Sequence, residues 1–262
     1  MSQFVPVSYE THGSKKWRRF NSYDFASRDA VIPLAAQELP HAVMSLPIGF
    51  VPMGETFVPV AILGLKPGEN LIVSPNGQWL GRYIPAVFRC HPFQLANTAD
   101  GQNVLCVAED SGLVTDGLDG EPFFDEGGRA AESVKDILVF LQGVHQGRLT
   151  AQRMCEALQK HALIQPWVIN VQSPSGNQRI DGIYQIDEAV LNRLSPGAVA
   201  ELHAAGALPL VYCQLLSTQH LPALGQMAAA RMQQPQLPIT PTGELDLEFL
   251  NQGGAIDFSR FS

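Results

Sequence analysis

The stretch GRYIPAVFRCHPFQL, residues 81–95, is the part of the chain richest in side chains capable of chemistry. It places Cys90 beside His91, the two residue types of a thiolate–imidazole catalytic pair. In a strand, successive side chains point to opposite faces of the sheet, so these two groups would project apart. Catalytic cysteine and histidine also normally come from separate parts of a chain. We therefore interpret Cys90 as a small buried hydrophobic residue.

The same alternation brings a second set of side chains together. Tyr83, Arg89 and His91 would share one face of the strand, and Arg82 would lie on the other. Pro85 has no N–H for a sheet, which predicts an edge or a bulge. Because arginine offers a planar fork of donors to anionic or hydroxyl-rich groups, these four residues predict a ligand site for a carboxylate, a phosphate or a sugar. The alternative is that both arginines pair with an acidic loop further along the chain.

This acidic loop, residues 109–128, is rich in glycine and carboxylates. It is long for an irregular loop in a compact domain, which indicates either a solvated surface loop or a flap over the ligand site. Glu109, Asp110 and Glu121 are its candidate ligand-binding residues. The regularly alternating acidic positions of a calcium loop are missing. The two catalytic carboxylates of a glycosidase must lie at a fixed distance from each other, and the sequence of the loop does not give that distance.

Composition and charge argue against several classes of protein. Hydrophobic residues make up 45% of the 262 residues, and the net charge is −8, whereas a nucleic-acid-binding protein needs a basic face. No apolar run reaches the roughly 20 residues of a membrane span, and the N-terminus lacks the pattern of a secretory signal. The four cysteines are far apart, and no phosphate-binding loop, nucleophile elbow or dinucleotide motif occurs. We expect a cytoplasmic protein with free thiols and neither metal nor cofactor.

The hydrophobic pattern predicts an α+β fold. After an irregular start (residues 1–45), we expect an antiparallel meander in the N-terminal half, with strands at 57–65, 71–73, 82–88 and 103–110 and a turn at Asn76-Gly77. The C-terminal half is predicted to be helix-rich, with one further hairpin over 167–186 and helices at 130–147, from Thr150 onward, and at 187–194, 195–206 and 221–234. The run 208–216 fits either a strand or a helix. We expect residues 1–234 to form one domain and residues 235–262 to form a Pro-rich linker and an acidic, aromatic tail that docks on the body.

Several segments, in order, resemble the SapC family. They are VAILGLKPGENLIV, GRYIPAVFRCHPF, GEPFFDEGG, LQGVHQG, LIQPWVI, IDGIYQIDEAVLNRL and ELHAAGALPLVYCQLLS. The order and spacing resemble the family from about residue 30 to residue 225. The closing AIDFSRF resembles the tail of that family. Arg82, Tyr83 and Arg89 fit its RY-P---R--PF pattern, whereas Cys90 and His91 replace a basic residue and a tyrosine. The resemblance implies an association with surface-layer or peptide-transport systems and with carbohydrate uptake, but no catalytic residue.

We therefore expect a soluble accessory or binding protein of a surface-layer or nutrient-uptake system. It would recognise a peptide or a sugar and contact a protein partner of that system. The rival hypothesis is a small-molecule enzyme that uses the Arg/His strand and the acidic loop.

Overall fold

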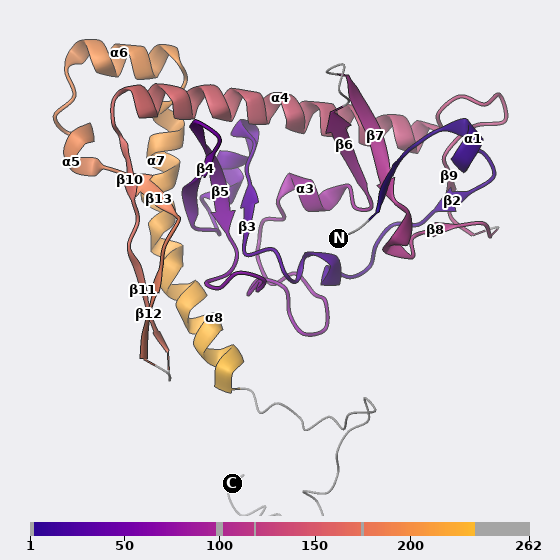
Figure 1. Cartoon of the computed structure of the whole chain (residues 1–262), viewed down its shortest axis with the longest axis horizontal. Coiled ribbons are helices and arrows are strands. Elements are labelled where there is room, and N and C mark those ends of the chain that lie inside the picture. Colours follow the sequence, from indigo (N-terminus) through magenta and orange to yellow (C-terminus); the bar gives the residue numbers. More distant parts are fainter. Residues whose placement is uncertain (1–2, 98–101, 118, 174–175, 234–262) are drawn as a thin grey trace, which may run out of the picture.

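The structure is a computed structural model that describes residues 3–97, 102–117, 119–173 and 176–233. Its fold is mixed α+β, with antiparallel sheets mainly in the N-terminal half and long helices later in the chain, which confirms the predicted class (Figure 1). The expected linker and tail, 235–262, lie outside the described residues.

The larger sheet has five strands in the order β10-β13-β4-β5-β3, all paired antiparallel. Their bounds are Val31–Pro33 (β3), Ile48–Met53 (β4), Thr56–Ile62 (β5), Ile164–Pro166 (β10) and Tyr184–Ile186 (β13). The predicted strand at 57–65 corresponds to β5. It forms a hairpin with β4 through Gly54, whose φ of 63° suits glycine.

Two smaller sheets use the N-terminal residues that we expected to be irregular. The first has the order β1-β7-β6, and in the second β2 lies between β8 and β9. The bounds are Phe4–Pro6 (β1), Lys16–Trp17 (β2), Phe93–Asn97 (β6), Asn103–Ala108 (β7), Val114–Thr115 (β8) and Glu121–Pro122 (β9). The expectation of an irregular start was wrong because its strands β1 and β2 have only three and two residues, which is too short to show alternation.

The predicted strand at 71–73 is also wrong, although its turn is present. Val73 forms a single bridge with Trp79, and the turn between them has Gly77 at a φ of 71°. The Asn76-Gly77 signal therefore marked a tight turn without the two strands that normally flank it.

The longest helix, α4 (Glu132–Lys160), lies along both main sheets and contacts β5 and β6 (Figure 1). We predicted two helices here, the first ending near Gly147, and this was wrong. A Cβ at Gly147 would overlap the side chain of Gln37, whose Nε2 donates to the carbonyl of Gly143 at 3.1 Å. Gly147 therefore marks the close approach of the short 3-10 helix η2 (Ala36–Glu38), not a helix end.

The other predicted helices are confirmed, and their capping residues act as expected. The side chain of Asp187 accepts from the Val190 N–H at 3.0 Å, and that of Ser195 accepts from the Ala198 N–H at 3.2 Å. The ambiguous run at 208–216 is helical. The helices besides α4 are α1 (Tyr9–His12), α2 (Leu39–Ala42), α3 (Ala86–Arg89), α5 (Glu188–Leu191), α6 (Pro196–Ala204), α7 (Leu208–Ser217) and α8 (Leu221–Gln233), and the other 3-10 helices are η1 (Asp24–Ala26), η3 (Glu109–Ser111) and η4 (Thr218–His220).

The predicted hairpin in the second half is present as β11 (Ile169–Ser173) and β12 (Gly176–Ile180). It projects from the body beside α8, and β13 leaves it to join the larger sheet (Figure 1).

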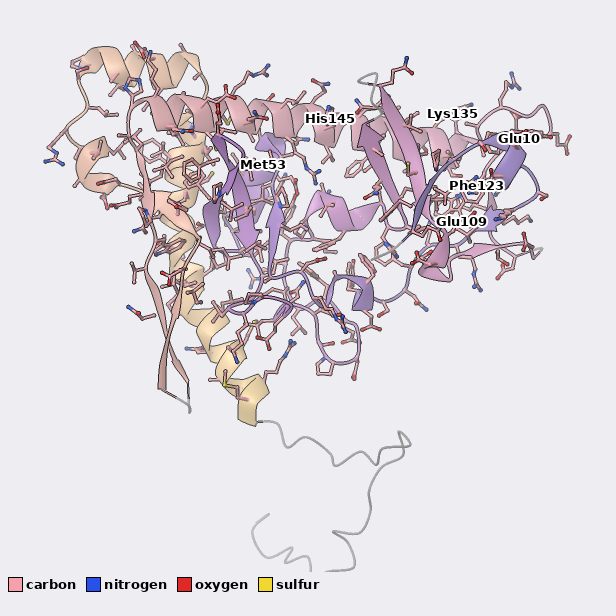
Figure 2. All side chains as sticks on the ribbon, in the orientation of Figure 1. Glu10, Met53, Glu109, Phe123, Lys135 and His145 are labelled. Atoms are coloured by element: carbon pink, nitrogen blue, oxygen red, sulfur yellow. The ribbon has the colours of Figure 1, made fainter. Side chains whose placement is uncertain are left out.

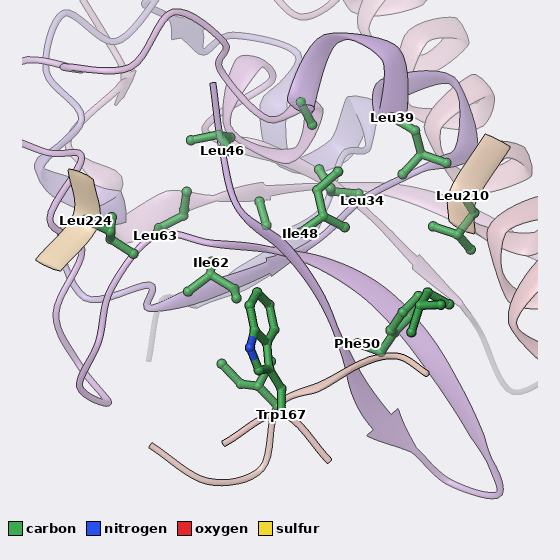
Figure 3. Close-up of a cluster of buried hydrophobic side chains, with 14 of the residues drawn as sticks. Leu34, Leu39, Leu46, Ile48, Phe50, Ile62, Leu63, Trp167, Leu210 and Leu224 are labelled. Carbon is green, nitrogen blue, oxygen red and sulfur yellow. The ribbon is translucent and has the colours of Figure 1, made fainter. Parts of the chain in front are cut away.

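Two main hydrophobic cores form against α4, and a small third cluster joins Ala35, Ala86 and Val144. The larger lies between the five-stranded sheet and the C-terminal helices, with Phe50, Leu63, Leu210 and Leu224 among its residues (Figure 3). The smaller is built from aromatic and aliphatic side chains of the N-terminal sheets. Because α4 contributes Leu158 to the larger core and Leu141 to the smaller, one helix holds both parts of the molecule together.

Among the described helices, none alone has the length and apolar composition needed to cross a membrane. Two neighbouring segments, Pro196–Ala204 and Leu208–Met232, reach that composition only when taken together, with a bend of 94° between them.

Candidate functional site

The segment 81–95 is not the continuous strand that we predicted: residues 86–89 form the helix α3, and only the last residues of the segment, from Phe93, are in a strand. Pro85, with φ −53° and ψ 142°, precedes α3, and β6 begins only at Phe93. The physical reason lies outside the segment. The buried carboxylate of Glu38 accepts the Ala86 N–H at 2.7 Å, a donor that a strand would give to its neighbour, and proline offers no N–H of its own.

Glu38 is the centre of this region, and sequence reasoning missed it. Its side chain is 3% exposed and accepts three hydrogen bonds, from the Ala35 N–H at 2.8 Å, the Tyr83 hydroxyl at 2.8 Å and the Ala86 N–H. The carboxylate thus joins η2, the loop before α3, and α3 itself. One signal was visible in the sequence, a single acidic residue inside the mostly apolar run VIPLAAQELPHAVM.

Tyr83 and Arg89 do come together, as the predicted site requires. The guanidinium of Arg89 lies 5.0 Å from the centre of the Tyr83 ring and 5.9 Å from that of Phe140. Burial raises the pKa of Tyr83, and nearby Glu38 raises it further, so its hydroxyl stays protonated and donates inward. Arg89 is exposed, and its Nε donates to the Ile84 carbonyl at 2.9 Å. The pair forms a cation–π platform at the surface.

His91 makes its ring contacts elsewhere, and Arg82 is exposed. The imidazole of His91 stacks on Phe25 with ring centres 3.8 Å apart and planes 6° apart. Burial lowers the pKa of His91 to about 4 and raises that of the Cys90 thiol to about 11. Both groups are therefore neutral near pH 7, so Cys90 is not an activated thiolate.

The acidic loop is held by a basic stretch near the N-terminus and not by Arg82 or Arg89. Lys15 Nζ lies 2.9 Å from Glu109, and Arg19 Nε lies 2.9 Å from Glu121. Asp110 is exposed in η3. Since β8 and β9 pair with β2, which belongs to the same basic stretch, most of the loop has a defined path. Glu109 and Phe123 lie near one end of the molecule, far from Met53 (Figure 2).

A buried histidine supports this contact. The His12 side chain is fully buried, and its Nε2 lies 3.1 Å from a Glu109 oxygen, at ion-pair distance but without hydrogen-bond geometry. Burial lowers the pKa of His12, although the Glu109 charge opposes this shift. The hydrogen bond from Lys15 is the main cause of a lowered pKa of Glu109. These carboxylates have protein partners, which fits a structural role for the loop.

Two hollows flank the root of the β11–β12 hairpin, and both touch Leu65. We call them together the hairpin-root groove. The first, of about 650 Å³, lies against β4 and the turn after β5, and the second, of about 500 Å³, lies against α8. Val51, Leu65, Lys66 and Ile180 are among the residues that line the first hollow, and Asn170, Gly225 and Gln226 are among those that line the second.

The walls of this groove are mainly apolar, and its polar groups lie at the rim. Lys66, Asn170 and Gln226 are exposed, whereas Ile169 and Trp167 form part of the buried floor of the second hollow. Paired Ile169 and Ile180 join the two hollows across the hairpin. An apolar surface with a few polar groups is typical of ligand sites. The sequence did not indicate it, because its walls come from six separate segments of the chain.

Within the described residues, no cluster of three or more histidine, cysteine or carboxylate side chains has the arrangement of a metal site. All four cysteines are free thiols. The rival enzyme hypothesis required Arg89, His91 and the acidic loop to meet, and the structure gives each of them other partners.

No curated protein and no solved structure matches the chain. The SapC family model matches residues 7–224, which is most of the chain and covers the hairpin-root groove almost entirely. The chain therefore belongs to the SapC family.

Proposed function

We propose that this protein is a binding protein that recognises an extended peptide in the hairpin-root groove. The observation that carries the proposal is the pair of hollows, about 650 and 500 Å³, that meet at Leu65. Each lies within the usual size of a ligand pocket, roughly 300–1,000 Å³. Two adjacent apolar hollows suit a ligand that presents apolar side chains at intervals, which is what an extended peptide does.

The hairpin supplies the polar part of such recognition. Among the described strands, β11 and β12 pair only with each other, so their outer edges carry backbone donors and acceptors. A peptide that adds to a strand edge gains main-chain hydrogen bonds, and pockets beside the edge select its side chains. A sugar is less well matched to this groove, since Trp167 is its single aromatic lining residue and is only 8% exposed.

The proposed role is that of an accessory protein in a surface-layer or nutrient-uptake system, with a protein partner there. This part rests on the resemblance of the chain to SapC proteins. Location in the cytoplasm, which the sequence predicts, is supported by the four free thiols, since disulfides are rare in reducing compartments. The earlier candidate site at Tyr83 and Arg89 remains a prediction, and its exposed guanidinium is tested in the same experiment.

The test uses acetylated and amidated hexapeptides of alternating leucine and serine, titrated against the purified full chain by calorimetry. The variant Gly225→Trp places a large side chain into the second hollow, where a Cβ meets open space. Its matched control is Ala230→Trp, an exposed position on the same helix. We expect Gly225→Trp to weaken peptide binding at least tenfold and Ala230→Trp to leave it unchanged.

Other outcomes assign the function elsewhere. Equal binding by both tryptophan variants would remove the groove from the proposal. Loss of binding in Arg89→Ala alone would return the site to the Tyr83–Arg89 platform. Binding of maltose-series sugars without binding of any peptide would contradict peptide recognition.

A further inference from the structure

A separate cavity of about 230 Å³ lies between α4 and the strands β3 and β5. It shares no lining residue with the hairpin-root groove. Figure 2 shows two of its residues, His145 on α4 and Met53 at the end of β4. Its apolar lining residues are Pro33, Leu34, Met53, Val58, Pro59 and Leu149.

The polar lining comes entirely from one face of α4. His145, Arg148 and Gln152 contribute three side chains, and their spacing of three and four residues places them on the same side of the helix. None of the lining residues is an aspartate or a glutamate. In a chain with a net charge of −8, this cavity therefore has a positive charge and no acidic wall.

The guanidinium of Arg148 has donors that the protein does not use. Its Nε is buried and has no hydrogen-bond partner among the described residues. A buried donor without a partner destabilises the fold, so such groups normally find one. Burial lowers the pKa of Arg148 from its ordinary value, but a guanidinium remains charged in proteins.

The nearest acidic group does not fill this need. Glu38 acts on Arg148 electrostatically and opposes the effect of burial on the pKa of the guanidinium. However, the oxygens of Glu38 accept from Ala35, Tyr83 and Ala86. The planar N–H fork of Arg148 thus stays available to a ligand with two acceptor oxygens.

Size and walls narrow the class of ligand. At about 30 Å³ per water, the cavity has the volume of roughly eight water molecules, which limits a ligand to a small organic molecule. Its apolar walls favour a hydrocarbon body. A neighbouring shallow hollow shares Met53 and Gln152 with the cavity and carries two carboxylates, Glu55 and Glu156, against one amine, that of Lys160. Its net negative charge disfavours a multiply charged anion such as phosphate.

We propose that this cavity binds a small monocarboxylate with a short apolar body, its two oxygens accepting from the guanidinium of Arg148. The hydrocarbon part lies against Leu34, Val58 and Leu149. The site is independent of peptide recognition in the hairpin-root groove, and either proposal can fail alone.

The test compares isovalerate with isovaleramide, which has nearly the same shape and no charge, by calorimetric titration of the full chain. Inorganic phosphate serves as the polyanion. We expect isovalerate to bind at least ten times more tightly than isovaleramide and phosphate not to bind, because charge-assisted bidentate bonds exceed neutral ones by more than 1.4 kcal/mol, a factor of ten.

Two variants locate the site. Arg148→Lys keeps the charge but loses the planar fork, and we expect at least a tenfold loss of isovalerate affinity. Arg153→Lys, at an exposed position on the same helix, is the matched control and keeps wild-type affinity. The unfolding midpoint of Arg148→Lys without ligand shows whether this variant is folded. If it folds poorly, Val58→Phe is the second test, because the larger side chain fills the cavity from β5 and should abolish isovalerate binding.

Three results would overturn the proposal. Equal affinity for isovalerate and isovaleramide would show an apolar cavity without anion recognition. Wild-type affinity in Arg148→Lys would remove the arginine from the site. The absence of heat with isovalerate at millimolar concentrations would show that the cavity holds only water.

Discussion

Replacing Glu38 with glutamine tests whether one buried carboxylate organises the region around α3. The substitution keeps the shape of the side chain but leaves a single acceptor oxygen. In the native chain one oxygen accepts from Ala35 and the other accepts from both Tyr83 and Ala86. In either orientation the new NH₂ group faces at least one backbone N–H, and that donor loses its acceptor.

The magnitude follows from these three bonds. A buried donor left without a partner costs about 1–3 kcal/mol, and hydrogen bonds to a charged group contribute about 1.5–3 kcal/mol. We therefore expect Glu38→Gln to lower the free energy of unfolding by about 2–4 kcal/mol. Tyr83→Phe removes one donor of the three, so its expected cost is about 1–2 kcal/mol. Glu126→Gln is the matched control at an exposed position and should change stability by less than about 0.5 kcal/mol.

The assay is urea unfolding followed by circular dichroism and by tryptophan fluorescence. A loss of about 3 kcal/mol shifts the midpoint by about 1 M when the slope is about 3 kcal/mol per molar. The double variant of Glu38 and Tyr83 should lose less than the sum of the two single losses, because both remove the same bond. A Glu38→Gln midpoint within 0.2 M (about 0.5 kcal/mol) of wild type would refute this account of the junction.

Three further predictions use other observations. In urea unfolding, Gly225→Ala should stabilise the chain by about 0.5–1 kcal/mol, because a Cβ at this helical position meets open space. Gly64→Ala should destabilise it by about 1–3 kcal/mol, because a Cβ there would overlap the Glu69 carbonyl. His91→Phe should flatten the fall in stability between about pH 6.5 and pH 4, since the folded pKa of His91 lies below its unfolded value, so the unfolded chain binds the proton first as pH falls; an unchanged slope would contradict the burial of this imidazole. Iodoacetamide at pH 7.5 should modify Cys213, the one cysteine that is not buried, faster than Cys155, because burial raises the pKa of Cys155 to about 12. Peptide mass spectrometry measures both rates, and faster modification of Cys155 would contradict its burial.

The parts of the fold that could be predicted from the sequence are those with local causes. Asp187 and Ser195 cap helices whose first turns lie within three residues of them. The strands β5 and β7 are long enough to show an apolar pattern, and Asn76-Gly77 forms its turn without distant help. In each case the stabilising contact lies within a short window of the chain, which is what sequence patterns report.

The parts that were predicted wrongly depend on distant contacts. The helical turn at Ala86 depends on a carboxylate 48 residues earlier in the chain. Gly147 lies inside a continuous helix, and its lack of a side chain makes room for Gln37, a residue about 110 positions earlier in the chain. Strand β1 pairs with β7, about 100 residues later. No local pattern contains these partners, and the prediction of a strand at 82–88 was wrong for this reason.

The candidate site divides in the same way. Tyr83 and Arg89 meet, as predicted, but through a helical turn and a cation–π contact and not through strand alternation. The carboxylates Glu109 and Glu121 meet Lys15 and Arg19, which no spacing rule relates to them. The hairpin-root groove and the cavity at Arg148 are formed by tertiary packing alone, so their residues carry no common motif.

The distribution of charges also bears on which surfaces are free to bind ligands. Side chains that a motif search selects, such as Glu109, Glu121 and Tyr83, have protein partners within ion-pair or hydrogen-bond distance. A ligand at those positions would have to displace a bond that already exists, and the net gain would be small. At Arg148 and in the hairpin-root groove the balance is different, because a ligand there covers an unpaired donor or an apolar wall and displaces only water. Binding energy is therefore greatest where the chain has left its own groups unmatched, which is why the two proposals use these surfaces in preference to the conspicuous Cys90-His91 pair.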